Sequence, residues 1–296
     1  MKCKINLLTI LQVIIILFFV SPGITLAKSP WAWQLSLKTN SNSKQLSMPF
    51  SLMIDPVKER YYVADAGNNR LVSFDKDGEL LNAFNANNSL KVPADLIRQN
   101  NEVLKVIEKG RSSITEINLN TKTVTPHQLS FDGKTIYPDR IENDDSRLYI
   151  LDKNSGAVLS FSPDLKPLIK YYDKDNDVHF VDFKIREGQV TALSHKEKNI
   201  YFFNDDGSIL SKLSLDKSII FPYSYAFGPA ELIYVVDRFD SSIVVVDFQG
   251  KFKYKFLGMG HVRGRLYYPS EIKFDPWGRL CVVDEGNGRV EIYSME

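Results

Sequence analysis

Residues Tyr61 to Phe74 read YYVADAGNNRLVSF, and a near copy, CVVDEGNGRVEIY, spans Cys281 to Tyr293. In both copies a β-rich run ends at an acidic residue, a Gly-Asn turn and an Arg follow, and a second β-rich run leaves the turn. This order predicts two antiparallel strands joined by a tight turn. Because degenerate copies recur down the chain, the hairpin is predicted to be part of a repeated unit.

Six such units can be overlaid by an anchor residue at which each one begins. The anchors are Pro49, Pro93, Pro138, His179, Pro222 and Pro269. They lie 44, 45, 41, 43 and 47 residues apart, which is the length of a four-stranded propeller blade. About fifteen residues after each anchor stands a polar residue that is predicted to end the second strand: Asp65, Glu108, Asp152, Ser194, Asp237 and Asp284.

A third strand is predicted in every unit, at Leu71–Phe74, Ile114–Ile117, Val158–Phe161, Ile200–Phe203, Ile243–Phe248 and Val290–Tyr293. Turns such as Asp77-Gly78 and Asp206-Gly207 lead to fourth strands, but the last unit stops after its third. Trp31–Leu37 alternates large apolar and polar residues and reads as an isolated strand. The sequence therefore predicts an all-β fold, a six-bladed β-propeller whose ring is closed by this N-terminal strand pairing with the last blade.

The repeated pattern resembles the NHL repeat. It consists of Pro-x-x-φ, then φ-Val-x-Asp-x-Gly-Asn-x-Arg-φ, then Asp-x-x-Gly, where φ is apolar, and it covers residues 48–296. The first, fifth and sixth units match best, and the glycine-spaced stretch Leu257 to Tyr268 resembles the segment that precedes many NHL units. The resemblance implies a six-bladed propeller of NHL-like repeats.

Members of that family that act as peptide-amidating lyases carry zinc-binding His residues just after the anchor in alternate blades. Here the corresponding positions are Phe50, Ala94, Asp139, Phe180, Tyr223 and Ser270. None is a His, so the resemblance does not imply this lyase activity. All four His residues are nevertheless expected on or next to one face, which keeps a metal site as an alternative: His127, His179, His195 and His261.

The spacing of Asp173, Asp175 and Asp177 is that of the first ligands of a calcium loop. The pattern then fails, because Val178 stands where such a loop needs Gly and Lys184 where it needs a bidentate Glu. The sequence therefore predicts a solvated acidic loop. No cofactor is assigned, and a divalent metal is kept only as an alternative.

Residues 1–27 differ in kind from the rest. Lys2 and Lys4 precede an apolar run from Ile10 to Val20, and small residues lead up to Ala27. This pattern predicts a secretory signal peptide cut after Ala27, export to the periplasm or the extracellular space, and no membrane span after cleavage. An uncleaved membrane anchor is the alternative.

Removal of the leader leaves 35 basic and 36 acidic residues, a net charge of −1, so nucleic acid is not an expected partner. Cys281 becomes the single Cys and is predicted to be a buried core thiol. The predicted organisation is a signal peptide (1–27), a closing strand and linker (28–47), and a propeller (48–296) with units near 48–91, 92–136, 137–177, 178–220, 221–267 and 268–296.

Strand direction alternates within a blade, so the turns between second and third strands and the connections between blades emerge on one face. A ligand is expected over the mouth of the central channel on that face. The candidate binding residues in these loops are Asn68, Asn69, Arg70, Arg111, Arg238, Asp240, His261, Arg263, Arg265, Asn287 and Arg289. Because the Asp and Arg positions repeat, an architectural role is the alternative: the Asp would accept hydrogen bonds from the turn that follows, and the Arg would pair with a neighbouring blade.

The predicted function is that of a secreted or periplasmic, non-enzymatic binding scaffold for a protein, peptide or glycan partner. The alternative is a metal-dependent propeller enzyme, either a lyase or a lactone or ester hydrolase, with its site at the channel mouth. No catalytic or metal-binding residue is assigned. Convergence of Asp, Asn and His side chains near the axis would favour the enzyme, whereas their placement on the surface would favour the scaffold. The partner's identity and the oligomeric state stay open.

Overall fold

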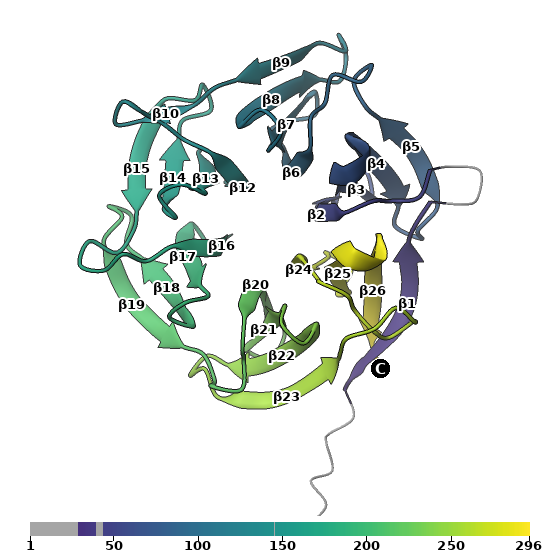
Figure 1. Ribbon diagram of the computed structural model, residues 1–296, viewed down its shortest axis with the longest axis vertical. Coiled ribbons are helices and arrows are strands. Elements are labelled where there is room, and N and C mark those ends of the chain that lie inside the picture. The colour runs from purple at the N-terminus through teal and green to yellow at the C-terminus, as the bar shows by residue number, and fades with distance from the viewer. Residues whose placement is uncertain (1–28, 40–43, 145) are drawn as a thin grey trace, which may run out of the picture.

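The computed structural model describes residues 29–39, 44–144 and 146–296, so the predicted signal peptide lies outside the described residues. Six four-stranded antiparallel sheets surround one axis (Figure 1). This arrangement confirms the predicted six-bladed β-propeller. Among the described residues, no helix has the length and apolar character needed to cross a membrane.

Each blade runs from an inner strand beside the axis to an outer strand at the circumference (Figure 1). Blade 1 contains β2 (Pro49–Asp55), β3 (Arg60–Asp65), β4 (Arg70–Asp75) and β5 (Leu80–Phe84). Blade 2 contains β6 (Pro93–Arg98), β7 (Val103–Glu108), β8 (Ser113–Asn118) and β9 (Val124–His127). Blade 3 contains β12 (Pro138–Asn143), β13 (Leu148–Asp152), β14 (Val158–Phe161) and β15 (Pro167–Tyr171).

Blade 4 contains β16 (Phe180–Arg186), β17 (Gln189–Ser194), β18 (Asn199–Phe203) and β19 (Ile209–Ser214). Blade 5 contains β20 (Pro222–Gly228), β21 (Leu232–Asp237), β22 (Ser242–Asp247) and β23 (Phe252–Leu257). Blade 6 contains β24 (Glu271–Phe274), β25 (Leu280–Asp284), β26 (Arg289–Met295) and β1 (Trp31–Leu37). Short elements complete the fold: η1 (Ala66–Asn68), η2 (Glu285–Asn287), β10 (Ser130–Phe131) and β11 (Lys134–Thr135).

The predicted ends of all six second strands are confirmed, since those strands end at Asp65, Glu108, Asp152, Ser194, Asp237 and Asp284. The fourth anchor is a correction. Phe180 pairs with Ser194 as Pro138 pairs with Asp152, so the anchor is Phe180 and not His179. This unit has no Pro at its start, and the sequence therefore offered no residue to fix its first position. Val181 is consequently the residue after the anchor.

Six apolar clusters hold the ring together, one at each junction between neighbouring blades. The second strands pack against neighbours on both faces, and every residue of β13 and β25 is buried. Burial on both faces explains why these strands read as continuous apolar runs instead of alternating ones. Cys281 lies in β25 and is buried, as predicted.

β1 closes the ring. It pairs antiparallel with β26, from Trp31 opposite Met295 to Leu37 opposite Val290, which confirms the predicted closure. The Trp31 ring meets Tyr234 of blade 5 edge-on, with ring centroids 5.9 Å apart. The closing strand thus also contributes to the junction between blades 5 and 6.

Closure by β1 predicts that Trp31→Ala lowers the free energy of unfolding by about 3–5 kcal/mol, because a buried aromatic side chain is lost from this junction. Urea denaturation followed by tryptophan fluorescence measures the change. The matched control is Gln34→Ala in the same strand, where the side chain is exposed and the expected change is within about 0.5 kcal/mol. Equal stability of the two variants would contradict the role given to β1.

Candidate functional site

The upper face is the side of the disc on which inner strands begin and second strands end. On this face, the carboxylate that ends the second strand receives the chain arriving from the previous blade. In blade 1 the amide of Ser47 donates to Asp65 at 2.7 Å. Corresponding bonds join Lys91 to Glu108, Tyr137 to Asp152, Ile220 to Asp237 and Tyr267 to Asp284. Backbone amides of the turn that follows the carboxylate also donate to Asp152 and Asp237.

The Gly-Asn-Arg turns of blades 1 and 6 brace the same carboxylates. Arg70 Nε lies 2.6 Å from Asp65, and Arg289 Nε lies 3.0 Å from Asp284. The Asn68 and Asn287 amides donate to those two carboxylates at 2.8 and 2.7 Å. A Cβ at Gly67 would lie 2.5 Å from the side chain of Ser47, so this turn needs Gly to meet the incoming chain. Four of the predicted binding residues therefore hold the blade together.

The other predicted binding residues also have partners, which they contact as follows. Asn69 accepts from the Val92 amide, Arg111 pairs with Glu108, Arg238 pairs with Glu285, Asp240 accepts from Ser242, His261 bonds Asn287, Arg263 stacks on Trp33, and the Arg265 carbonyl accepts from Arg289. The structure does not bring the eleven residues together as one site. Only Arg238 reaches the rings beside the axis, where its guanidinium lies 4.5 Å from the centroid of Tyr223.

The axis itself is occupied by an arginine that the sequence reading did not single out. Arg140 leaves β12 of blade 3, and its Nη2 donates at 2.7 Å to the carbonyl of Ser270 in blade 6, on the opposite side of the ring. Nη1 lies 3.6 Å from Glu271. Only 2% of Arg140 is exposed, so this side chain closes the axis below the upper face.

Neighbouring inner strands are joined by a repeated hydrogen bond. The side chain two residues after the anchor accepts from the amide three residues after the next anchor. Four junctions show this bond: Asp95 with Ile141, Asp182 with Tyr225, Ser224 with Ile272, and Glu271 with Leu52. At the other two junctions this position holds Ser51 and Arg140, and the Leu96 and Phe183 amides donate instead to Asp95 and Asp182 of their own strands. Arg140 has no acceptor atom.

The axial charges shift one another's pKa values. Burial raises the pKa of Asp95 to about 6, and Glu271 adds to the rise, while Lys273 and Arg140 oppose it. Burial would also raise the pKa of Asp182, but the charges of Lys184 and Arg140 outweigh that effect and lower it. The axis is therefore a closed ion network in which every charge depends on its neighbours.

Two clusters of cations and aromatic rings lie above Arg140. In one, Lys109 pairs with Asp139 at 2.8 Å and lies 3.4 Å from the ring centroid of Phe50. Burial lowers the pKa of this lysine. In the other, Arg238 pairs with Glu285 at 2.8 Å and stacks on Tyr223. Each cation has both a carboxylate and a ring as partners.

An apolar rim surrounds these clusters. It consists of the residue before the anchor in five blades, with exposed fractions between 37 and 58%: Met48, Val92, Tyr137, Phe221 and Tyr268. Blade 4 has His179 at this position. The sequence reading missed the rim, although an overlay of the units one position before the anchor would have shown it.

The backbone holds the rim side chains outward. The bonds to the second-strand carboxylates fix the amides of the rim segments, and three rim residues adopt left-handed φ angles near +50°: Met48, Val92 and Tyr268. A β-branched residue such as Val92 rarely adopts this conformation, because its Cβ approaches the following carbonyl. The rim therefore keeps apolar side chains in water at a cost in backbone strain.

The four His residues do not form a metal centre. His261 bonds Asn287 and packs on Tyr267, whereas His195 packs on Phe221. Among the described residues, no group of three or more His, Cys, Asp or Glu side chains is placed to hold a metal ion. The predicted solvated loop is wrong for Asp173, which is buried and lies 2.8 Å from Lys212 Nζ.

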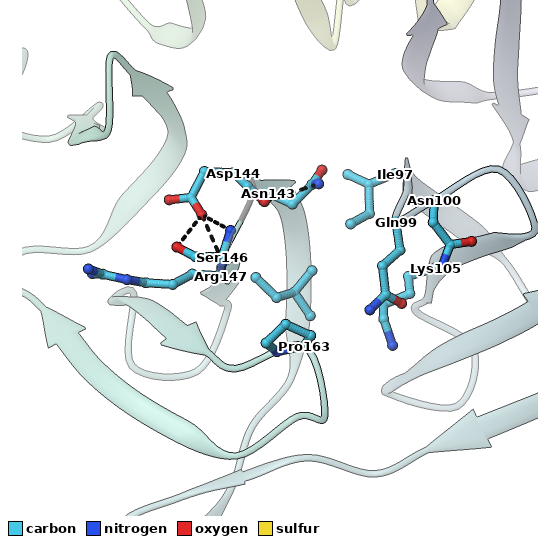
Figure 2. Close-up of a pocket in the computed structure, with 10 residues that line it drawn as sticks. Ile97, Gln99, Asn100, Lys105, Asn143, Asp144, Ser146, Arg147 and Pro163 are labelled. Carbon is cyan, nitrogen blue, oxygen red and sulfur yellow. Dashed lines mark hydrogen bonds between the residues drawn. The ribbon is translucent and has the colours of Figure 1, made fainter.

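A hollow of about 240 Å³ lies on the opposite face, between blades 2 and 3 (Figure 2). One wall carries Gln99, in the turn after β6, and Lys105 of β7; the other carries Asn143 at the end of β12 and Pro163, in the turn after β14. The Asp144 carboxylate accepts hydrogen bonds from the amides of Ser146 and Arg147 and so stabilises its own turn. We therefore place the candidate site on the upper face.

Comparisons with known proteins show the fold. No protein-family model and no curated protein matches the chain, so the NHL resemblance stays a prediction. A streptogramin B lyase structure aligns at 12% identity with a TM-score of 0.67, covering 90% of this chain and 98% of that one. A catalytically inactive virginiamycin B lyase from Staphylococcus aureus with quinupristin, and the selenomethionine-substituted enzyme, align at 12% identity with TM-scores of 0.63 and 0.62, covering 88% of each chain. At this identity the likeness concerns the fold alone.

Closure of the axis predicts that Arg140→Leu lowers the free energy of unfolding by about 3–5 kcal/mol, because three buried carboxylates lose their shared cation. Urea denaturation at pH 7.5 measures the change. Arg60→Leu is the control, since Arg60 is exposed at the start of β3 and its loss should cost within about 0.5 kcal/mol. An Arg140→Leu protein as stable as the unchanged chain would refute the network.

The raised pKa of Asp95 predicts a pH-dependent effect. The folded state holds the Asp95 proton more tightly than the unfolded chain, so this group makes stability fall as the pH rises from about 4 to 6. Asp95→Asn removes that contribution, and the stability difference between the two proteins should change by about 2 kcal/mol between pH 4 and pH 7. Urea titrations across this range measure it, with the exposed Asp77→Asn as control. A difference that stays constant with pH would show the assignment to be wrong.

Proposed function

We propose that this chain is an exported NHL-type propeller that binds a protein or peptide partner, without chemical conversion, over the upper face. The apolar rim is the observation that carries the proposal. Of the fifteen large apolar side chains that are exposed among the described residues, nine lie on this face. Exposed apolar side chains that gather on one face of a soluble protein commonly mark a binding surface.

The positions of the nine side chains support a binding surface. Five belong to the rim, and the other four come from adjoining loops: Ile220, Phe239, Met259 and Val262. A ring of aliphatic and aromatic side chains around paired cations suits the apolar side chains and backbone of a polypeptide.

Closure of the axis supports surface binding. Arg140 lies directly under the mouth and is fixed by Ser270 and Glu271. A partner would therefore remain on the upper face instead of entering a deep pocket. Loops on a rigid propeller give such a surface a fixed shape, which reduces the entropy lost when a partner binds.

The competing function is a metal-dependent propeller enzyme, and the similarity in fold to streptogramin B and virginiamycin B lyases is what favours it. The side chains at the corresponding positions of this chain supply too few ligands for a metal ion. The residues after the anchors are Phe50, Ala94, Asp139, Val181, Tyr223 and Ser270, which offer one carboxylate and no imidazole. That carboxylate, Asp139, already pairs with Lys109. Catalytic zinc needs about three convergent protein ligands.

Replacement of the rim tests the proposal. A random peptide library displayed on phage is selected on residues 28–296, and the enriched peptides are titrated against a Met48→Ser, Phe221→Ser, Tyr268→Ser variant. Loss of three apolar contacts should weaken binding at least about tenfold, since each such contact contributes about 1 kcal/mol or more.

The matched control is Leu81→Ser, Leu168→Ser, Leu210→Ser, which removes exposed apolar side chains from three outer strands. This control should bind as the unchanged chain does. Equal loss of binding in the two variants, or enriched peptides that ignore the rim, would reject the proposal. The competing enzyme function is tested by elemental analysis of the purified protein and by thermal unfolding with and without a chelator. One tightly held divalent ion per chain, whose removal lowers the melting point, would favour the enzyme.

A further inference from the structure

The two faces of the disc carry opposite charge. On the upper face, the six turns between second and third strands contain six cationic and three acidic side chains, and the connections between blades contain eight and five. On the lower face, the turns of the described residues contain seven cationic and eleven acidic side chains. Counted over these loops, which leave out the five carboxylates that end second strands, the upper side is positive and the lower side negative, although the chain as a whole is close to neutral. Such a field favours a partner of negative charge on the upper face.

Half of the cations in the upper turns already have an acidic partner: Lys109 with Asp139, Arg111 with Glu108, and Arg238 with Glu285. The other half are Lys153, Lys196 and Lys198, and no carboxylate of the described residues lies within ion-pair distance of them. Lys153 and Lys196 are exposed, and they occupy the same turn in the adjacent blades 3 and 4. These lysines are available to an external carboxylate.

Apolar side chains flank this pair of lysines. Tyr137 of the rim directly precedes blade 3, and Phe221 precedes blade 5 and packs on the His195 ring at 4.9 Å. His195 Nδ1 is buried and has no hydrogen-bond partner within the described part of the chain. The sector around blades 3 and 4 thus combines unpaired cations, exposed rings and an unsatisfied ring nitrogen.

We infer that the partner of the upper face is an acidic polypeptide segment, whose carboxylates pair with Lys153 and Lys196 while adjoining apolar side chains pack on Tyr137 and Phe221. This inference rests on the proposed function and names its ligand class. The rim distinguishes a polypeptide from a nucleic acid, because aliphatic residues such as Met48 and Val92 offer nothing to phosphates. In the acidic segment 173–177 on the same face, Asp173 is paired with Lys212 and Asp177 lies 3.6 Å from His179. Asp175 is exposed, so the two lysines outnumber the carboxylate of this segment that has no basic partner among the described residues.

Charge reversal tests the inference on the full exported chain. Peptides enriched from the displayed library should contain Asp or Glu beside aromatic or aliphatic residues. Lys153→Glu, Lys196→Glu should weaken an enriched peptide about tenfold, whereas the equally charged control Lys58→Glu, Lys251→Glu on the lower face should stay within about twofold. A peptide in which Asn and Gln replace the Asp and Glu residues should bind weakly to the unchanged chain. The Lys153→Glu, Lys196→Glu variant should bind this peptide with the same affinity as the unchanged chain does.

Each outcome has a separate meaning. Peptides that depend on the rim but lack acidic residues, or that ignore Lys153 and Lys196, overturn this inference and leave the proposed function standing. Absence of any rim-dependent peptide overturns both. If single-stranded DNA or heparin binds these lysines more tightly than the enriched peptides do, the partner is a polyanion and the inferred acidic polypeptide is overturned. Self-association that the upper charge reversal abolishes would identify a second copy as the occupant and would also overturn the inference.

Discussion

The hydrogen bonds from the incoming chain to the carboxylate that ends the second strand, found in five of the six blades, are the constraint on which the structure depends. Asp65, for example, receives the Ser47 amide together with the side chains of Asn68 and Arg70. One buried carboxylate thereby fixes the end of a strand, the turn after it and the connection between blades. The same bonds fix the rim backbone and leave its side chains in water. Architecture and the proposed binding surface therefore have one physical origin.

Side-chain hydrogen bonds also join the inner strands around the axis. Four junctions use a side chain of one inner strand to accept an amide of the next, whereas Arg140, at the same position in blade 3, crosses the ring and donates to Ser270. A buried charge of this kind is stable only among opposite charges, which the inner strands supply as Asp95, Asp182 and Glu271. The axis thus became a closed support for the upper face, which explains why we place the binding surface around the mouth and not within it.

The fold was largely predictable because its determinants are local and repeated. Strand ends and third strands followed from residues that recur in almost every unit, and closure by Trp31–Leu37 followed from a last unit that stops after its third strand. The fourth anchor was misplaced at His179 because no Pro marks Phe180. The candidate site was harder, since Asn287 and Arg289 look available in the sequence but bind Asp284. The cross-axis reach of Arg140 depends on long-range geometry that no single unit encodes.

The central claim is that the rim and the upper turns together form the binding surface. Amide hydrogen exchange of residues 28–296, with and without a saturating rim-dependent peptide, tests this most directly. The account predicts slower exchange in the segments that precede the inner strands and in the turns after the second strands of blades 3 to 5. Slower exchange confined to the outer strands or to the turns of the lower face would contradict it.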